Sequence, residues 1–353
     1  MNNRQVKLKL TKKQENIVNE WILQCTSIYN FGIRKIELNA KDKIYFTKIN
    51  FQNLLANHAK VIGIPSHTIQ GVLTQAFIAW QRCFKKVAKK PKLKGIRNKL
   101  RSIPFPDPIK SPKEGKISLP ILGKIRFFKQ ELPVGKIKNG RLIKKASGFY
   151  LQLTIDSNHV FPVKTTDNRI GIDTGFKHLA ILSDGNKFSN KRFFTKSQKR
   201  LGQAQRGGDK KLAAKLHEKI ANQRNDYNHK VSRQIVENYN EIYITNDNLK
   251  AQSAIFGKSV MDAGISELRN FILYKGDNHG RKVTLINSRN TTKTCSNCMS
   301  LTGPTGMSEL DVRKWECTTC RVVHDRDINA ACVVLKFGLG YNLVNLKSSG
   351  GNR

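Results

Sequence analysis

The sequence predicts a mixed α/β protein in which an α/β domain is joined to a small β barrel. Three patterns lead to this prediction. Period-two alternation marks strands between residues 103 and 160, short buried strands alternate with long helices in the C-terminal half, and two Cys-x-x-Cys pairs lie near the C-terminus. The chain has 353 residues and is 39% hydrophobic. It can therefore bury sizeable cores, over two or three domains.

The charge is strongly one-sided. The formal net charge is +39, from 64 Lys and Arg against 25 Asp and Glu. Such an excess repels itself unless a polyanion neutralises it, so the composition predicts nucleic-acid binding. Binding to a membrane surface is disfavoured, because the basic residues are spread along the chain without a long amphipathic anchor. No apolar run is long enough to span a bilayer, and the N-terminus has no export signature. We expect a cytoplasmic, nucleoid-associated protein with reduced cysteines.

The N-terminal half predicts a strand at residues 4–10, a helix over 12–38 and a second helix over 66–86 with Ser66 as its N-cap. A basic, proline-broken stretch at 85–95 follows. We interpret this stretch as a linker that lies along a phosphate backbone. Its lysines are Lys85, Lys86, Lys89, Lys90, Lys92 and Lys94.

The β part predicts strands at 116–119, 124–127 and 150–155, separated by Gly and Pro residues. They indicate a small antiparallel barrel or sandwich. The N-terminal strand is expected to join it, so that the helices at 12–86 form an insertion between its strands.

From residue 169 the pattern changes. Buried strands are expected at 170–173 and 179–182, then a long helical region over 212–235, and further strands at 241–246 and 281–286. A helix around 261–276 precedes the last strand. One face of the long helical region is basic and is a candidate nucleic-acid surface. That face includes Lys215, Lys219 and Arg224.

Four cysteines form the strongest local motif. They are Cys295, Cys298, Cys317 and Cys320, two Cys-x-x-Cys knuckles separated by a short loop. Four thiolates at this spacing are the ligand set of a closed, structural zinc site that folds a ribbon too small to hold a core of its own. His324 lies nearby, but four thiolates already fill the site. The remaining cysteines stand in apolar stretches and are expected to be small core residues. They are Cys25, Cys83 and Cys332.

Two aspartates are candidates for a second metal site. Asp173 ends a buried strand, and Asp327 stands near the start of a helix that contains the small residues Ala330 and Ala331. Two-metal nucleases need carboxylates that converge from separate elements, because both ions must be clamped about 4 Å apart around the scissile phosphate.

The order of these motifs resembles the TnpB family, the RNA-guided, RuvC-like proteins of bacterial insertion sequences that are related to type V CRISPR effectors. The resemblance covers nearly the whole chain. Its motifs are Gly171-Ile172-Asp173-Thr174-Gly175, Leu119-Pro120-x-Leu122-Gly123, Leu132-Pro133-x-Gly135-Lys136, the basic helix at 216–224, Asp262-Ala263-Gly264, the two cysteine knuckles and Asp325-Arg326-Asp327-x-Asn329-Ala330-Ala331.

The resemblance implies an RNase-H-like (RuvC) domain at 164–290 and 321–353 with a zinc ribbon inserted at 291–320. It also implies a β-barrel (wedge) domain at 1–10 and 96–163, into which a helical recognition domain with the basic linker, 11–95, is inserted. The implied partners are a guide RNA and a double-stranded DNA target, with one protein molecule per RNA. A short motif beside the target would be read by the N-terminal half, and Asp, Glu and Asp would cleave DNA with Mg²⁺.

The chain departs from the family at the glutamate. Aligned without gaps, the strand Ile242-Tyr243-Ile244-Thr245 places Thr245 at this position. A register with two extra residues places Asp247 there, on the same strand face but displaced by about 6–7 Å. A neutral hydroxyl cannot replace a charged ligand. Glu267 is another acid nearby, at a position that is not catalytic in the family.

Thr245 therefore favours an RNA-guided DNA-binding protein with lost or weakened cleavage, similar to the nuclease-dead TnpB-like repressors of transcription. An active endonuclease with Asp247 as its third acid is the close alternative, favoured by the intact Asp173 and Asp327. A ribosomal type of zinc-ribbon protein would not explain the acids. A DNA-rearranging transposase would need a complete triad or a nucleophilic tyrosine. The tail from 337 to 353 is expected to be flexible.

Overall fold

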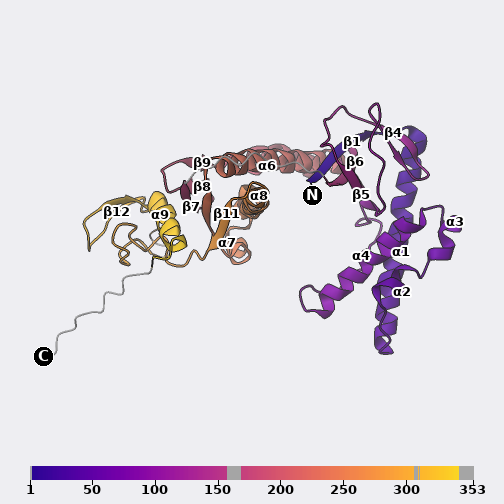
Figure 1. Cartoon of the computed structure of the whole chain (residues 1–353), viewed down its shortest axis with the longest axis horizontal. Coiled ribbons are helices and arrows are strands. Elements are labelled where there is room, and N and C mark those ends of the chain that lie inside the picture. Colours follow the sequence, from indigo (N-terminus) through magenta and orange to yellow (C-terminus); the bar gives the residue numbers. More distant parts are fainter. Residues whose placement is uncertain (1, 157–167, 306–308, 310, 342–353) are drawn as a thin grey trace. The chain divides into compact units, whose positions relative to one another are not determined.

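The computed structural model describes residues 2–156, 168–305, 309 and 311–341. The chain divides into two compact units, residues 1–159 and 160–353, which we describe separately. Figure 1 labels their helices and strands along the chain. None of the helices in the described part combines the length and the apolarity that a membrane-spanning helix requires.

The first unit contains a curved antiparallel sheet and four α-helices. Its six strands are hydrogen-bonded in the order β2-β5-β6-β1-β4-β3, and the edge strands β2 and β3 are not paired with each other, so the sheet is a half-barrel and not a closed barrel. The elements are β1 (Asn2–Lys9), α1 (Lys12–Lys41), α2 (Lys48–Gln52), η1 (Ala56–His58), α3 (Ala59–Ile62), α4 (Ser66–Phe84), β2 (Ser102–Phe105), β3 (Lys116–Leu119), β4 (Gly123–Phe127), β5 (Lys136–Lys145) and β6 (Gly148–Asp156).

The helices of the first unit share one hydrophobic core with the sheet. Val6 of β1, Trp21 of α1, Leu73 of α4 and Leu151 of β6 are all buried in it. The helices lie between β1 and β2 in the chain, as the sequence predicts. Ser66 is not the N-cap of α4, however. Pro65 occupies that position and gives the helix no side-chain cap. The interior of the core includes Cys25, whereas Cys83 and Cys332 are only partly buried.

The second unit contains a five-stranded mixed sheet in the order β11-β10-β7-β8-β9. β10 is parallel to both of its neighbours, while β7, β8 and β9 form an antiparallel meander. Its elements are β7 (Arg169–Asp173), β8 (His178–Leu182), β9 (Lys187–Ser189), α5 (Phe193–Arg206), α6 (Lys210–Asn238), β10 (Glu241–Thr245), α7 (Leu249–Ala263), α8 (Ile265–Asn278), β11 (Lys282–Ile286), β12 (Lys314–Glu316), β13 (Val323–Asp325) and α9 (Arg326–Gly338).

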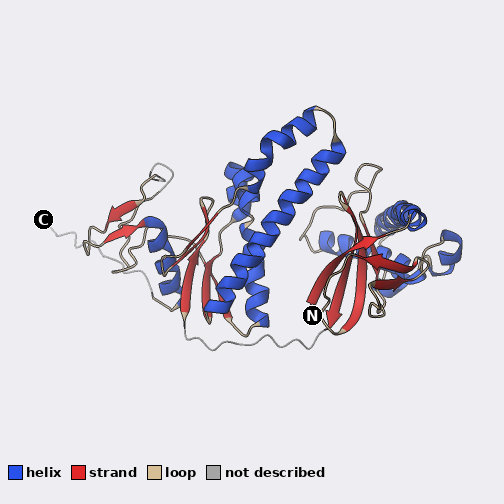
Figure 2. Cartoon of the chain, turned by 90° about the horizontal axis from the view of Figure 1, so that it is seen from above, coloured by secondary structure: helices blue, strands red, loops and turns tan. Residues whose placement is uncertain are grey.

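Helices cover both faces of this sheet (Figure 2), with α9 on one side and α6 and α8 on the other. Side-chain alternation along β7 explains the arrangement. Ile170 and Ile172 belong to the core that α6 and α8 complete, whereas Gly171 faces α9. A Cβ atom at Gly171 would lie 2.1 Å from the carbonyl oxygen of Ala331 and 2.6 Å from the amide nitrogen of Leu335. The helix backbone therefore lies directly on the strand.

Several elements differ from the sequence predictions. The helix expected at 261–276 is two helices, α7 and α8, which meet at Gly264 in the left-handed conformation with φ +66°. α7 starts earlier because Asn248 caps it through a hydrogen bond from the Ala251 amide. α9 continues to Gly338, so the first residues of the tail expected to be flexible are helical. Residues 342–353 of that tail and the predicted domain boundary at 163/164 lie outside the described residues.

The close approach of α9 to β7 gives a first testable prediction. Gly171→Ala should lower the free energy of unfolding by about 1–3 kcal/mol, because the added methyl group overlaps helix backbone that cannot rotate away. Chemical denaturation measures this change. Gly257→Ala is the matched control, since a Cβ atom there meets nothing within 4 Å. Equal effects of the two substitutions would contradict the proposed steric cause.

Candidate functional site: an acidic pair, a threonine cluster and a four-cysteine cluster

Two of the candidate site residues of the second unit lie at the carboxyl ends of adjacent parallel strands. Asp173 ends β7, and Thr245 ends β10 beside it. Both have the strand parity of Gly171, so they stand on the face that α9 covers. Asp327 lies in the first turn of α9. The fold thus brings Asp173, Thr245 and Asp327 toward one region from three different elements.

Thr245 is fully buried and its hydroxyl is bound by Thr174. The Thr174 amide donates to Thr245 Oγ1 at 3.3 Å, and the two hydroxyl oxygens are 3.0 Å apart. Thr174 Oγ1 also lies 3.0 Å from Asp247 Oδ2. An ionised carboxylate only accepts, so Thr174 must donate to Asp247, and Thr245 must then donate to Thr174. The hydroxyl pair is therefore satisfied, and it holds Asp247 close to the strand ends.

The three aspartates interact electrostatically. Burial, followed by the charges of Asp247 and Asp327, raises the pKa of the Asp173 carboxyl to about 8. Asp247 is half-buried, and Asp327 retains 24% of its side-chain exposure. Among the described residues, however, the acids do not form a group of three or more side chains that could hold one metal ion. The region is a set of mutually repelling carboxylates, looser than a one-ion cage.

A cavity of about 600 Å³ opens beside Asp173 and Asp327. Asp173 and Asp327 line it, and Asp247 does not. Four basic side chains also line it, namely Lys177, Arg192, Lys258 and Arg313. The guanidinium of Arg313 lies 3.6 Å from Asp327 Oδ1. Asp262 is a third acid in the lining. A cavity that combines carboxylates with a cationic lining suits a divalent ion together with a phosphate backbone.

The acids singled out elsewhere in the second unit have structural contacts. Glu267 accepts hydrogen bonds from the side chains of Asn225 and Asn228 on α6 and lies 3.5 Å from Arg224 Nε. It ties α8 to α6. Asp262 accepts from the Phe194 and Thr195 amides, so it caps the start of α5. Neither contact involves Asp173 or Asp327.

The four cysteines converge as the sequence predicts. The thiol sulfurs of Cys295, Cys298, Cys317 and Cys320 all lie within 4.8 Å of one another. Two of the Sγ–Sγ distances are 3.6 Å. A tetrahedral site with metal–sulfur bonds of about 2.3 Å requires sulfur–sulfur distances of about 3.8 Å. The cluster therefore fits a metal ion. His324 is not a fifth ligand in this arrangement, because its Nε2 atom lies 3.1 Å from the sulfur of Cys295 and its ring packs against Trp315.

Polar groups around the cluster favour thiolate. Burial raises the pKa of Cys317, but hydrogen bonds, the first from the Thr302 hydroxyl, outweigh burial and lower it to about 5. Burial raises the pKa of Cys295 to about 12. A bound cation would deprotonate both groups, since a coordinating thiol loses its proton. Cys317 is therefore a thiol of the cluster whose surroundings favour the negatively charged form.

The basic residues singled out in the sequence differ in their availability. Of the linker lysines, Lys94 is half-buried, and the others are exposed. The linker backbone is held on α1, because Asn30 exchanges two hydrogen bonds of 2.8 Å with the backbone of Lys94. On α6, Lys215 and Lys219 are exposed. Arg224 instead donates to the Met261 carbonyl at 2.6 Å and approaches Glu267, so it is engaged within the unit.

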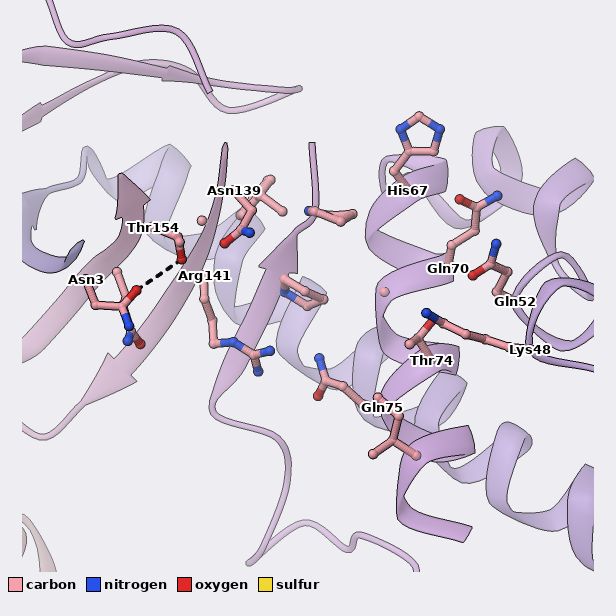
Figure 3. Close-up of a pocket in the computed structure, with 17 residues that line it drawn as sticks. Asn3, Lys48, Gln52, His67, Gln70, Thr74, Gln75, Asn139, Arg141 and Thr154 are labelled. Carbon is pink, nitrogen blue, oxygen red and sulfur yellow. Dashed lines mark hydrogen bonds between the residues drawn. The ribbon is translucent and has the colours of Figure 1, made fainter. Parts of the chain in front are cut away.

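The first unit contains a polar cavity of about 560 Å³. Figure 3 shows side chains of α4, including Gln70 and Thr74, facing Asn139, Arg141 and Thr154 of β5 and β6 across it. None of the described residues that line this cavity is acidic. The Nε2 atom of Gln75, one of the lining residues, is buried without a hydrogen-bond partner. Amide and guanidinium groups of this kind match the edges of nucleic-acid bases.

Comparison with known proteins identifies the class. Residues 152–253 match the model of a family described as a probable transposase (OrfB_IS605), and residues 266–334 match that of the Cas12f1-like TNB domain. These ranges include Asp173, Asp247, Asp327 and all four cysteines. These matches support a protein of the TnpB family.

Individual relatives cover most of the chain. It is 28% identical over 306 residues to the putative RNA-guided DNA endonuclease InsQ of Escherichia coli (strain K12), which covers 78% of this chain and 75% of the relative. It is 27% identical over 305 residues to a putative RNA-guided DNA endonuclease of Streptomyces pristinaespiralis, covering 81% and 74%. A cryo-EM structure titled as a Cas12f1–sgRNA–target DNA complex aligns with 95% of this chain and 99% of its own at a TM-score of 0.38 and 17% identity.

Sequence reasoning missed three residues that shape the site. Thr174 was read only as the variable residue of the glycine motif, yet it joins Thr245 to Asp247. Arg313 lies in the loop between the cysteine knuckles and reaches Asp327. Asn329 stands within the Asp325–Ala331 motif, and its side chain binds the backbone on both sides of Cys295. Nothing in the local sequence around Arg313 indicates that its side chain points toward Asp327.

The charge repulsion at Asp173 predicts a pH-dependent effect of Asp247→Asn. The substitution keeps an oxygen that can accept from Thr174 but removes a negative charge. Because the folded-state pKa of Asp173 is raised, its ionisation destabilises the fold as pH rises toward 8. In buffer without divalent ions or chelator, the melting temperature should rise by about 3 °C at pH 8 and stay unchanged at pH 5. The control Asp277→Asn removes an exposed charge from α8. A shift of equal size at both pH values would argue against repulsion.

Proposed function

We propose that this TnpB-family chain is an RNA-guided DNA-binding protein whose strand cleavage is lost or weakened, and that it acts as a guide-RNA-directed repressor of transcription. The observation that carries the proposal is Thr245. It is fully buried at the end of β10, and its hydroxyl is bound by Thr174, so this position offers a metal ion no carboxylate. Base pairing with the guide would supply sequence specificity, while the protein holds the strands by charge and shape.

Loss of one carboxylate matters because of how two metal ions work. Each ion stabilises an attacking or leaving oxygen, and the ions stay together only if enough negative charge surrounds them. Asp173 and Asp327 line the cavity, and Asp247 does not. Asp262 is a third acid in the lining, but its carboxylate accepts hydrogen bonds from the amides at the start of α5. We propose that the cavity still holds a DNA strand through its basic lining, and that Mg²⁺ acts there only if the acidic set is functional.

An active Mg²⁺-dependent endonuclease is the second candidate, and one observation favours it. Asp247 accepts a hydrogen bond from Thr174 and contributes more than Asp327 to the raised pKa of Asp173. Its carboxylate is therefore close enough to repel Asp173. A small movement toward the cavity would complete an Asp173, Asp247 and Asp327 set.

The domain roles follow from the same family membership. We propose that the five-stranded sheet with its helices is the RuvC-like domain, that the four-cysteine segment is a zinc ribbon, and that the half-barrel and α1–α4 act as wedge and recognition elements. Four thiolates at tetrahedral spacing favour zinc over the harder ions that prefer oxygen. The polar cavity of the first unit, with its glutamines and Arg141, is our candidate for reading the bases beside the target.

A row of like charges on the half-barrel supports a polyanionic partner. Arg126 of β4 stands directly opposite Lys9 of β1 on one side and opposite Lys116 of β3 on the other. Like charges in directly opposite positions destabilise a sheet. The ion pairs found among the described residues include none of the three. Phe128 lies beside this row with 47% exposure, and the ammonium group of Lys9 is 4.4 Å from its ring centre. Such a surface suits RNA, which offers both phosphates and unpaired bases.

The cleavage proposal is tested with the protein and the RNA that co-purifies with it. The RNA is sequenced, and the complex is incubated with Mg²⁺ and a matched duplex while binding and strand cleavage are scored separately. We expect binding without cleavage in the wild type. Thr245→Glu should raise cleavage by about two orders of magnitude, because it adds the missing charge. Thr245→Gln is the matched control, since it adds the same bulk without the charge.

Wild-type cleavage that is abolished by both Asp173→Ala and Asp247→Ala would reject the repressor proposal and establish Asp247 as the third acid. Cleavage that survives Asp247→Ala but not Asp173→Ala would contradict both candidate functions, because the active site would then need a third acid other than Asp247.

The row of like charges predicts opposite effects on stability and on RNA binding. Arg126→Thr should raise the melting temperature of the free protein by about 2–4 °C, because it relieves repulsion on both sides, and should weaken RNA binding several-fold. Lys124→Thr is the control, because Lys124 lies opposite Ser118 and not opposite a charge. Thermal unfolding and filter binding give the two readouts. A loss of both stability and binding in Arg126→Thr would indicate a structural role instead.

A further inference from the structure

Asn329 connects the helix that carries Asp327 to the first cysteine knuckle. Its side chain is 2% exposed. The Nδ2 group donates to the carbonyl oxygen of Thr294 at 2.8 Å, and Oδ1 accepts from the amide of Ser296 at 2.8 Å. Thr294 and Ser296 are the two neighbours of Cys295 in the chain. One side chain thus forms hydrogen bonds to the backbone on both sides of a cysteine of the four-cysteine cluster.

The first turn of α9 has a second set of contacts at its start. Asp325 Oδ1 accepts from the amides of Asp327 and Ile328, both at 3.0 Å. The amide of Arg326 donates to the carbonyl of Arg313 at 2.8 Å, within the loop between the knuckles. Asn329 follows Asp327 by two residues, so Asp327 lies between the contacts at the start of α9 and those of Asn329. The position of Asp327 therefore depends on the four-cysteine segment as well as on the sheet.

That segment has little else to hold its shape. Its buried apolar cluster consists of Cys295, Trp315 and Cys317, with Cys298 and Cys320 packed against it. A segment of this size cannot support a fold by burial alone, and a bound metal supplies the missing free energy. The backbone around Cys295 is therefore expected to keep the geometry that Asn329 needs only when the four thiolates are occupied.

We infer that Asn329 is a positioning residue that couples metal occupancy of the four-cysteine cluster to the placement of Asp327. With metal bound, the knuckle backbone holds Asn329, and the first turn of α9 presents Asp327 to the cavity. Without metal, this contact is lost, and the turn loosens while the rest of α9 stays packed on β7 through residues such as Ala331 and Val334. The functional consequence of this coupling rests on the proposed function, in which Asp327 faces the DNA strand.

Hydrogen exchange on the nucleic-acid-free protein tests this inference. Amide exchange of residues 327–330 is compared in the zinc-loaded protein and after removal of zinc by a selective chelator, with the strands β7 and β10 as internal references. In the wild type, chelation should speed exchange of the first turn about tenfold and leave the references unchanged. Asn329→Ala should exchange faster even with zinc bound and should respond little to chelation.

Two further variants sharpen the test. Asn329→Asp keeps the acceptor for Ser296 but has no donor for Thr294, so its exchange should be intermediate. Asn222→Ala removes an exposed asparagine on α6 and should behave as the wild type. Coupling is reciprocal, so Asn329→Ala should also bind zinc more weakly, by the same factor as it changes the opening of the turn.

The inference is overturned if chelation leaves the exchange of residues 327–330 unchanged in the wild type. It is equally overturned if Asn329→Ala, compared in its zinc-loaded and chelated forms, keeps the full response to chelation. Because no RNA or DNA is present, failure of the RNA-guided binding proposal would not alter either outcome.

Discussion

The contact between α9 and β7 is the constraint on which the second unit depends. Gly171 lets the helix backbone lie against the strand, and the buried small residues Ala330 and Ala331 complete the contact. The two candidate acids come from these two elements, since Asp173 ends the strand and Asp327 begins the helix. A bulkier contact would separate them by the thickness of a side chain, so the spacing of the acids is set by residues that carry no charge. The glycine of the Gly-Ile-Asp motif is thus explained by packing.

The four-cysteine segment extends this constraint beyond the sheet. It is inserted directly before α9, and its loops bind the first turn of that helix from two sides, through Asn329 and through the Arg313 carbonyl. The segment also supplies the Arg313 guanidinium beside Asp327. A cluster without an open coordination position has no chemistry of its own. Its position in the chain nevertheless gives it influence over the acid that follows it.

Much of this arrangement could be predicted from the sequence, and the reasons are physical. Strand periodicity located β7, β8 and β10, because side-chain alternation is a local property. Strand parity predicts one face for Thr245 and Asp247 if the strand continues, but β10 ends at Thr245. The convergence of the cysteines followed from ligand spacing. The division of 249–278 into α7 and α8 was missed, since it depends on Asn248 and Gly264 and not on an apolar period. The contacts of Thr174, Arg313 and Asn329 are long-range, and no local pattern encodes them.

Thr245 is well accommodated in this structure. Three carboxylates at the strand ends would repel one another strongly in a metal-free protein, and two neighbouring aspartates already raise the pKa of Asp173 to about 8. A glutamate at position 245 would add a further charge beside a buried acid. Threonine adds none, and each of its hydrogen-bonding needs is met by Thr174. A protein that must hold DNA without cutting it loses nothing by this exchange and gains stability in the absence of Mg²⁺, since functional sites commonly trade stability for activity. The neutral residue therefore suits a binding role, while Asp247 keeps enough charge near the cavity for that role to be tested directly.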